Sequence, residues 1–185
     1  MANRWRSKYA LVLIPLGALL LWGALFAPYL LQETRGPKRL VQNEFPNFLA
    51  TDWAGRSGDF HDHLAPGRRY VVALWATWCE PCLREMPQIQ KQRDLYRQKG
   101  IEFLLINYDG GLPDKTIPEV KAWMISQRLE LESFFDFKEV LFSKLNVVGL
   151  PYALGVDENR RILWNHMGEI DWMDLRWLEK TAKGN

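Results

Sequence analysis

A buried strand that runs directly into a pair of cysteines constrains the fold of this chain more than any other feature. The stretch "RRYVVALWAT" (68–77) is a nearly continuous apolar run, which is the pattern of a strand buried on both faces. Cys79 and Cys82, the only cysteines, follow at once in "WATWCEPC". From Cys79 to about Lys99 the apolar residues recur with helical spacing. The cysteines are therefore expected at the start of a helix that follows a buried strand.

The same patterns predict the other elements of the domain. Around Asp52, Gly55 and Gly58, two short strands are expected on either side of a turn. The remaining expected elements are a buried strand at 101–107, a helix at 117–129, a strand at 133–137, a helical segment at 138–145, strands at 152–157 and 161–166, and a last helix in which Ile170, Met173 and Trp177 share one apolar face. This order predicts an α/β fold, a mixed sheet flanked by helices.

The spacing of the two cysteines suits reversible disulfide chemistry. Residues three apart in the first turn of a helix lie about 5–6 Å apart, which is inside the range that a disulfide bridges. The partial positive charge of a helix N-terminus favours a thiolate there. Pro81 is suited to this first turn because its missing N–H would have no helical partner.

Helical geometry predicts different environments for the two sulfurs. Cys82, Met86, Ile89 and Tyr96 fall on one stripe of the helix, the stripe expected to pack on the sheet. Cys82 should therefore be buried. Cys79 precedes this stripe at the helix tip, and it is predicted to be the exposed, attacking thiol.

Glu85 lies at the edge of the same stripe, three residues after Cys82. A carboxylate against a core is destabilised when charged, so the pKa of Glu85 should be raised. Such a group could exchange a proton with Cys82 during catalysis. The alternative is a partly solvated first-turn glutamate that only complements the helix dipole.

Other uses of the cysteine pair fit the sequence less well. A structural zinc site needs four ligands, usually with a second CxxC or a histidine pair, and no further cysteine exists. Covalent haem attachment needs a histidine directly after the second cysteine, where Leu83 stands. A purely structural disulfide that closes so short a loop would constrain the unfolded chain little. The cluster His61–His63 is interpreted as a polar surface loop. A redox-active Cys79–Cys82 disulfide, without another cofactor, is the favoured interpretation.

The first 44 residues predict a membrane anchor and a linker. A basic tail (1–8) precedes an uncharged run (9–31), which as a helix would span about 35 Å, enough for a hydrocarbon core of about 30 Å. A polar linker (32–44) then leads to the expected domain (45–183). A cleaved signal peptide and a buried core helix are the alternatives, but the run has no convincing cleavage site and no polar face. Basic residues on both sides leave the orientation open.

The charge of the chain does not favour nucleic acid as a partner. The whole chain has a net charge of +2, of which the first eight residues contribute +3, so the remainder has a net charge of −1. No basic stripe is evident in the remainder, and binding to nucleic acid is not expected.

The motif "VVALWATWCEPCLREMP" resembles the thioredoxin superfamily, and the best match is the membrane-anchored TlpA/ResA/CcmG (DsbE) branch. "VVGLPYALGVDENRRI" (147–162) supports the same resemblance. The resemblance implies a cis proline at Pro151 beside the active site, which would let backbone groups of Leu150 meet an extended substrate segment. Trp78 and Pro151 are expected to shape the surface on which the substrate docks. It also implies that Glu85 is a functional acid. Two residues depart from common patterns, because Ala73 replaces the buried aspartate of cytoplasmic thioredoxins and Tyr152 stands where a threonine is common.

The branch implies a location and partners. Its members are single-pass proteins of the bacterial inner (cytoplasmic) membrane, with the catalytic domain in the periplasm or on the outer face. The implied activity is protein-disulfide reduction, on the haem-attachment cysteines of apocytochrome c or on copper-site proteins during assembly of respiratory complexes. The implied electron donor is a membrane thiol transporter of the CcdA/DsbD kind.

Two other functions of the fold remain open from the sequence. A copper-delivery module similar to the Sco family would use Cys79, Cys82 and His166, since thiolates with an imidazole suit Cu(I); that family, however, spaces its cysteines one residue wider. A thiol peroxidase would need a threonine three residues before a lone cysteine, where this chain has Ala76.

Overall fold

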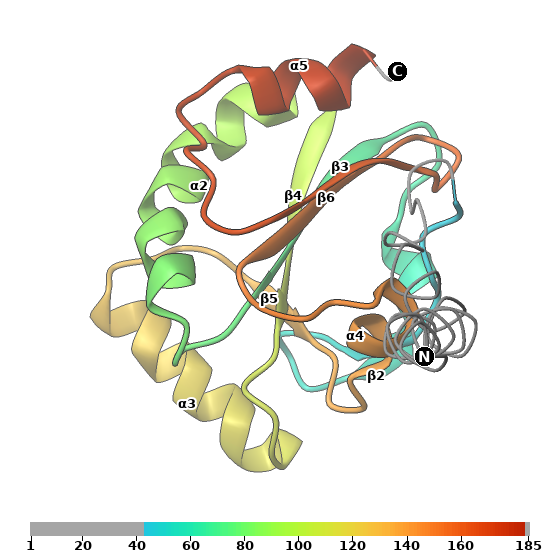
Figure 1. The fold of residues 1–185 in the computed structure, drawn as a ribbon. Helices are drawn as coiled ribbons and strands as arrows, with labels where there is room; N and C mark the ends of the chain where they lie inside the picture. The colour runs from blue at the N-terminus through green and yellow to red at the C-terminus, as the bar shows by residue number, and fades with distance from the viewer. Residues whose placement is uncertain (1–42, 184–185) are drawn as a thin grey trace, which may run out of the picture. The chain divides into compact units, whose positions relative to one another are not determined.

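The computed structural model describes residues 43–183, which contain a single mixed β-sheet with helices packed against it (Figure 1). In chain order the elements are β1 (Leu49–Thr51), β2 (Ser57–Asp59), the 3-10 helix η1 (Phe60–His63), β3 (Arg69–Trp75), α2 (Glu80–Gln98), β4 (Ile101–Asn107), α3 (Pro113–Ser126), β5 (Ser133–Phe135), α4 (Val140–Leu145), β6 (Tyr152–Val156), β7 (Ile162–Met167) and α5 (Arg176–Lys183). The strand order is β2-β1-β5-β4-β3-β6-β7. The predicted α/β class with a mixed sheet is confirmed.

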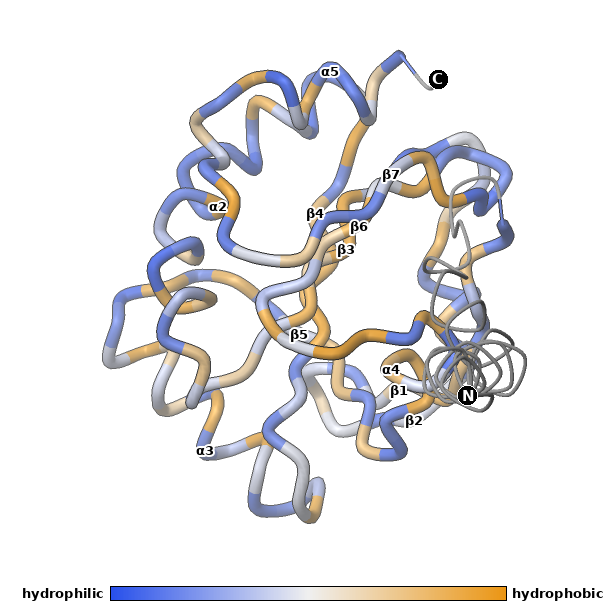
Figure 2. Tube along the Cα trace, in the orientation of Figure 1, coloured by the Kyte–Doolittle hydropathy of each residue, from blue (hydrophilic) through white to orange (hydrophobic). Residues whose placement is uncertain are grey.

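The strand β3 lies in the middle of the sheet and is buried along almost its whole length. It pairs in parallel with β4, from Arg69 opposite Ile101 to Trp75 opposite Asn107. On its other side it pairs antiparallel with β6, with Leu74 opposite Tyr152. The central strands form the apolar interior in Figure 2. This two-sided burial explains why the β3 sequence is continuously apolar rather than alternating.

The helix α2 buries the predicted stripe against the sheet. Cys82, Met86, Ile89 and Tyr96 are each at most 1% exposed, and Phe103 of β4 packs on the Tyr96 ring with 4.6 Å between ring centroids. In Figure 1, α2 and α3 lie to the left of the sheet and α4 lies to the right. The first turn of α2 is thereby fixed at the carboxyl end of β3.

The helix α3 begins four residues earlier than the sequence indicated. Pro113 occupies a first-turn position, where its lack of an N–H is tolerated. The backbone N–H groups of Lys115 and Thr116 both donate to the carbonyl of Leu112, at 3.0 and 2.9 Å. The Thr116 hydroxyl also donates to the Gly110 carbonyl, at 2.6 Å. These local bonds convert part of the expected loop into the first helical turn.

The prediction of one last helix containing Ile170, Met173 and Trp177 is wrong for the first two residues. The helix α5 begins at Arg176, after Asp174 accepts the backbone N–H of Arg176 at 2.9 Å. Residues 168–173, here called the strap, are not helical, and side chains of α2 accept two of their backbone N–H groups. Glu85 accepts from Ile170, and Gln88 accepts from Trp172.

The N-terminal predictions fall almost entirely on residues that the structure does not describe. The basic tail (1–8), the apolar run (9–31) and most of the linker (32–44) lie outside the described residues. Within 43–183, no helix is both long enough and apolar enough to cross a bilayer. Glu44 forms a bridge with Arg161, and Asn43 accepts the N–H of Ile162 at 2.9 Å, so the end of the predicted linker contacts β7.

Candidate active site

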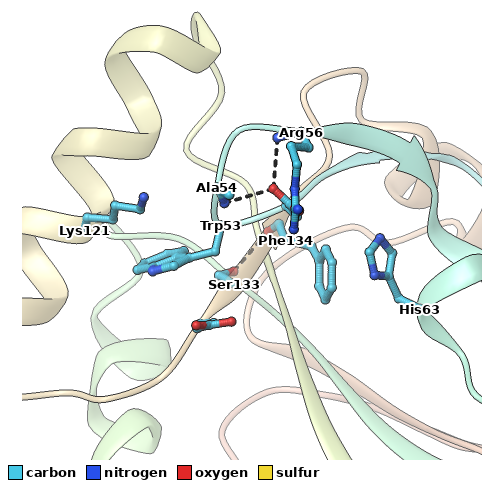
Figure 3. Close-up of a pocket in the computed structure, with 9 residues that line it drawn as sticks. Trp53, Ala54, Arg56, His63, Lys121, Ser133 and Phe134 are labelled. Carbon is cyan, nitrogen blue, oxygen red and sulfur yellow. Dashed lines mark hydrogen bonds and ion pairs between the residues drawn. The ribbon is translucent and has the colours of Figure 1, made fainter.

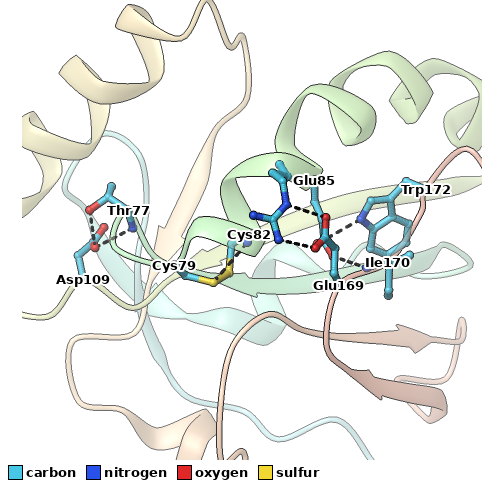
Figure 4. Close-up of a disulfide and its surroundings, with 9 residues drawn as sticks. Thr77, Cys79, Cys82, Glu85, Asp109, Glu169, Ile170 and Trp172 are labelled. Carbon is cyan, nitrogen blue, oxygen red and sulfur yellow. Dashed lines mark hydrogen bonds and ion pairs between the residues drawn. A yellow bond between two sulfur atoms is a disulfide. The ribbon is translucent and has the colours of Figure 1, made fainter.

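The two cysteines form a disulfide where β3 leads into α2 (Figure 4). Their Cα atoms are 5.3 Å apart. Cys79 is the N-cap residue of α2, and its Sγ accepts the backbone N–H of Cys82 at 3.3 Å. Cys79 therefore takes the position at which a helix leaves backbone donors unsatisfied, as the spacing predicted.

The prediction that Cys79 is exposed is wrong for this disulfide form. Cys79 is 4% exposed and Cys82 is 1% exposed. The reason is that the Cys79 sulfur turns back over the helix N-terminus, where it is bonded to Cys82 and accepts its N–H. The predicted order of the two sulfurs still holds, with Cys79 the more accessible.

The loop that precedes Cys79 is held by a carboxylate that the sequence analysis missed. Asp109 Oδ1 accepts the backbone N–H of Thr77 at 2.9 Å and its hydroxyl at 2.8 Å. Asn107 fixes the other oxygen of Asp109, at 2.6 Å. A sequence signal did exist, because Asp109 follows the end of β4, and parallel neighbours such as β3 and β4 end at the same edge of a sheet.

Trp78 projects from this loop beside a surface groove. Its side chain is 67% exposed. The groove has a volume of about 480 Å³, and Trp78 lines it together with Leu112, Trp123 and the backbone at Gly110 and Gly111. An exposed tryptophan next to the disulfide is accessible to a protein substrate, so the expected docking role of Trp78 stays a prediction.

Pro151 lies at the same edge of the sheet as the cysteines. The Leu150–Pro151 peptide bond is cis, which confirms the implied isomer. Tyr152 is opposite Leu74, so the preceding Pro151 is next to the end of β3. Pro151 is buried and Leu150 is partly buried. Their segment therefore lies next to the end of β3, from which the chain continues into the turn that carries Cys79.

Glu85 is the most perturbed acid near the disulfide. It is 3% exposed, and desolvation on burial raises its pKa to about 7. The Ile170 N–H donates to one carboxylate oxygen, and the Trp172 indole N–H donates to the other at 3.3 Å (Figure 4). These two bonds lower the pKa, but desolvation outweighs them. The predicted raised pKa agrees with this environment, which is that of a buried acid rather than a solvated first-turn glutamate.

A partly exposed ion pair lies near Glu85. Arg84 contacts Glu169 through two bonds, from Nε at 3.0 Å and from Nη2 at 2.6 Å. Arg84 also lies 3.4 Å from Glu80. The arginine lowers the pKa of Glu85 and the Glu169 carboxylate raises it, so the two charges oppose each other at this site.

His166 is not brought together with the cysteines as a ligand set. It lies on β7 opposite Ala153, and its ring packs against Trp177 with 5.0 Å between ring centroids. The cluster His61–His63, predicted to be a surface loop, belongs instead to the 3-10 helix η1, where His61 Nε2 lies 2.8 Å from the Phe45 carbonyl oxygen. Among the described residues, no group of three or more histidine, cysteine or acidic side chains is arranged to hold a metal ion.

A second cavity lies away from the disulfide (Figure 3). It has a volume of about 360 Å³ and shares no lining residue with the cysteine site. Two of its cations already have partners, since Arg56 pairs with Asp52 at 2.7 Å and Lys121 lies over the Trp53 ring. The arrangement gives no indication of redox chemistry there.

Comparison with known proteins places these features in a family. The family model described as the AhpC/TSA family matches residues 41–165. The thiol-disulfide oxidoreductase ResA of Bacillus thuringiensis subsp. konkukian is 28% identical over 152 residues, covering 82% of this chain and 84% of the relative. The thiol:disulfide interchange protein DsbE of Vibrio cholerae is 28% identical over 179 residues, covering 93% and 91%.

Solved structures support the same fold. A thiol:disulfide interchange protein of the thioredoxin family from Chlorobium tepidum superposes with a TM-score of 0.59 at 22% identity, covering 75% of this chain and 94% of that one. StoA from Bacillus subtilis gives 0.58 at 18% identity, covering 72% and 96%. With a thioredoxin-like sheet and a disulfide at the start of α2, the chain belongs to the AhpC/TSA family, as a thiol-disulfide oxidoreductase of the ResA and DsbE type.

Proposed function

We propose that this protein is a membrane-tethered reductant of protein disulfides that works outside the cytoplasm. The observation that carries the proposal is the Cys79–Cys82 disulfide at the N-terminus of α2, with the buried acid Glu85 one turn behind Cys82. A dithiol at a helix N-terminus is readily deprotonated, and a buried acid whose pKa is about 7 can gain or lose a proton near neutral pH.

The proposed reaction transfers two electrons from the dithiol to a substrate disulfide. The Cys79 thiolate attacks one substrate sulfur, and the substrate disulfide breaks as a mixed disulfide forms. Glu85 in its charged form accepts the proton of the Cys82 thiol. Cys82 then attacks Cys79, which closes the Cys79–Cys82 disulfide and releases the second substrate sulfur. The substrate leaves as a dithiol that has gained two electrons and two protons: one proton comes from Cys82 by way of Glu85, and the other is taken from solvent, to which Cys79 released its proton on forming the thiolate.

Three residues around the disulfide are proposed to hold the substrate. Trp78 offers an exposed aromatic face next to Cys79. Leu150 and Pro151 lie at the neighbouring edge of the sheet, next to the end of β3. An extended substrate segment between these two walls would bring its disulfide to the more accessible sulfur, Cys79.

The proposed substrates are the haem-attachment cysteines of apocytochrome c, or cysteines of copper-site proteins. The relatives named ResA and DsbE support a protein-disulfide substrate in general. The apolar run 9–31 supports tethering in the bacterial inner membrane, with the domain on the outer face. A reducing centre in an oxidising compartment needs an electron supply, for which a CcdA/DsbD-like membrane donor is proposed.

The activity is tested with insulin as a model disulfide substrate. The reduced protein should reduce insulin disulfides, and Cys79→Ser should abolish the reaction. Cys82→Ser should instead accumulate a mixed disulfide, because the attacking thiol remains while the resolving thiol is lost. Identification of the captured protein in cell membranes would then name the client. Retention of insulin reduction in Cys79→Ser would refute the assigned order of attack.

The direction of electron flow is tested by the reduction potential. Glu80 lies between the cysteines and disfavours a nearby thiolate, so a potential nearer to about −270 mV, as in thioredoxin, than to about −120 mV, as in DsbA, is expected. Equilibration with defined dithiothreitol or glutathione buffers measures it. A DsbA-like value would show an oxidant rather than a reductant.

A further inference from the structure

Among the described residues, both hydrogen bonds to the Glu85 carboxylate come from the strap (residues 168–173), although the strap lies more than 80 residues away in the sequence. We propose that Trp172 is a positioning residue for the redox reaction, whose indole N–H holds the Glu85 carboxylate and tunes how readily that carboxylate takes up a proton. This inference rests on the proposed function, because Glu85 must exchange a proton with the cysteine pair for the tuning to matter.

The position of the Trp172 indole is fixed from several sides. Trp172 is fully buried, and its backbone N–H donates to Gln88 Oε1 of α2 at 2.9 Å. Its ring makes an edge contact with Phe103 of β4, with 5.2 Å between ring centroids, and a more distant one with Tyr96, at 6.5 Å. The indole is held between α2 and the sheet, so its N–H has little freedom to turn away from Glu85.

The chemistry of this contact favours one protonation state of Glu85. An indole N–H can donate but cannot accept, so it stabilises the charged carboxylate and does nothing for the O–H of the neutral acid. It therefore opposes the desolvation that raises the pKa of Glu85. The Ile170 backbone N–H acts in the same direction, but every residue except proline supplies such a group. The indole N–H, in contrast, depends on tryptophan being the residue at position 172.

The other ionisable groups around Glu85 do not provide the same control. On α2 these are Cys82 at the start of the helix, the phenol of Tyr96, which is neutral because burial raises its pKa, and Arg84 with its partner Glu80. The strap contributes the Glu169 carboxylate. Arg84 is bound to Glu169, and these two exposed charges act on Glu85 in opposite directions. Trp172 differs from them because it bonds directly to the carboxylate in the buried interior.

The central experiment compares Trp172→Phe with Trp177→Phe. Phenylalanine keeps an aromatic ring but removes the donor, so the pKa of Glu85 should rise by about one pH unit, the worth of a hydrogen bond to a charged group. The side-chain carboxyl ¹³C resonance of Glu85 measures this shift, with Glu85→Gln as the assignment control. Trp177 also packs on Trp172, at 6.5 Å between ring centroids, but within the described part of the chain it forms no hydrogen bond with Glu85, so Trp177→Phe should leave the titration of Glu85 unchanged. An unshifted Trp172→Phe titration, or equal shifts in both variants, would overturn the proposal.

A measurement on the unaltered protein covers the case in which Trp172→Phe does not fold. The indole Nε1–H resonance of Trp172 should move with pH at the same midpoint as the Glu85 carboxyl, and this movement should disappear in Glu85→Gln. An indole resonance that is constant from pH 5 to 9 would contradict the contact.

The pH profile of insulin reduction separates the two proposals. Trp172→Phe should move the midpoint of the pH profile to higher pH. Glu85→Gln and the double variant Glu85→Gln/Trp172→Phe should have the same profile as each other. If Trp172→Phe moves the Glu85 titration but Glu85→Gln leaves the profile unchanged, the proton role of Glu85 in the proposed function fails. If Glu85→Gln changes the profile but Trp172→Phe moves neither quantity, only the positioning role fails.

Discussion

At the residue scale, Glu85 shows how a local sequence pattern and a distant segment combine. Its place on the helical stripe next to Cys82 puts the carboxylate against the core, and helical spacing in the sequence predicts this position. Its hydrogen-bond partners come from the strap, which no local pattern identifies. Burial decides the direction of the pKa shift, and the two donors limit its size.

The raised pKa of Glu85 predicts a pH-dependent stability. Since the pKa rises from 4.5 in the unfolded chain to about 7 in the folded protein, the protonated acid contributes stability that is fully present below pH 4.5. This stability is lost as the pH rises through about 7. The free energy of unfolding should therefore fall by about 3 kcal/mol over this interval. Glu85→Gln should not show this fall in denaturant titrations at pH 5 and pH 8.

The control for this prediction is Glu169→Gln. Glu169 is 41% exposed at its side chain, so its removal should leave most of the pH-dependent fall in place. Parallel stability curves for the unaltered protein and Glu85→Gln would mean that Glu85 does not titrate as a buried acid.

Asp109 provides the second prediction at this scale. Asp109→Ala removes the acceptor for the Thr77 N–H and hydroxyl, so the loop that carries Trp78 and leads to Cys79 should lose its fixed geometry. Insulin reduction should slow by about tenfold, the equivalent of one hydrogen bond to a charged group. Asp114→Ala, an exposed acid in the first turn of α3, should retain full activity. Equal activity of the two variants would show that the loop does not depend on Asp109.

At the scale of elements, hydrophobic periodicity predicted α2, β3 and β4 well because each element has one simple pattern of burial along its length. β3 is buried on both faces, and α2 has one buried stripe. The prediction of the last helix was wrong because Ile170 and Trp177, although both apolar, pack in different places. Ile170 is buried in the strap, which is bonded to α2, whereas Trp177 packs from α5 onto Trp164 of β7. Helical spacing alone could not separate these two environments.

The pairing of β6 with β7 leads to a prediction about Gly155. A Cβ at this position would lie 2.2 Å from Nε1 of the Trp164 indole. That indole is fixed because it donates to the Thr181 hydroxyl of α5 at 3.0 Å. Gly155→Ala should therefore displace the ring, loosen α5 from the sheet and destabilise the protein by about 1–3 kcal/mol, as measured by urea denaturation.

Gly58→Ala is the matched control for this substitution. Gly58 lies in β2, and a Cβ there would have no neighbour within 4 Å. The free energy of unfolding of Gly58→Ala should remain within about 0.5 kcal/mol of that of the unaltered protein. Equal stability of the two alanine variants would contradict the close approach of Trp164.

At the scale of the whole molecule, the proposed tether makes a prediction about location. The full chain should sediment with membranes and resist extraction by salt, and deletion of residues 9–31 should release a soluble, active domain. An impermeant maleimide should label Cys79 in intact cells after mild reduction, because the domain is proposed to face outward. Labelling only after cell lysis would place the cysteines in the cytosol and refute the proposed role.

Local sequence patterns were enough to predict the α/β class with a mixed sheet, the cysteine pair at a helix start and the acid one turn behind it. These features depend on short-range spacing, because two cysteines three residues apart at a helix start are close in any fold that keeps the helix. The stripe from Cys82 to Tyr96 likewise puts Glu85 near the core. The cis bond before Pro151 was implied by resemblance, not by spacing.

The surroundings of the cysteine pair depend on contacts between segments that are far apart in the sequence. The contact of Asp109 with Thr77 depends on the parallel pairing of β3 with β4, and the contact of Trp172 with Glu85 depends on the strap crossing α2. The low exposure of Cys79 in the disulfide form also follows from packing. Local periodicity reports which face of an element is apolar, but not which distant residue covers that face, because the partner is set by how the whole sheet is assembled.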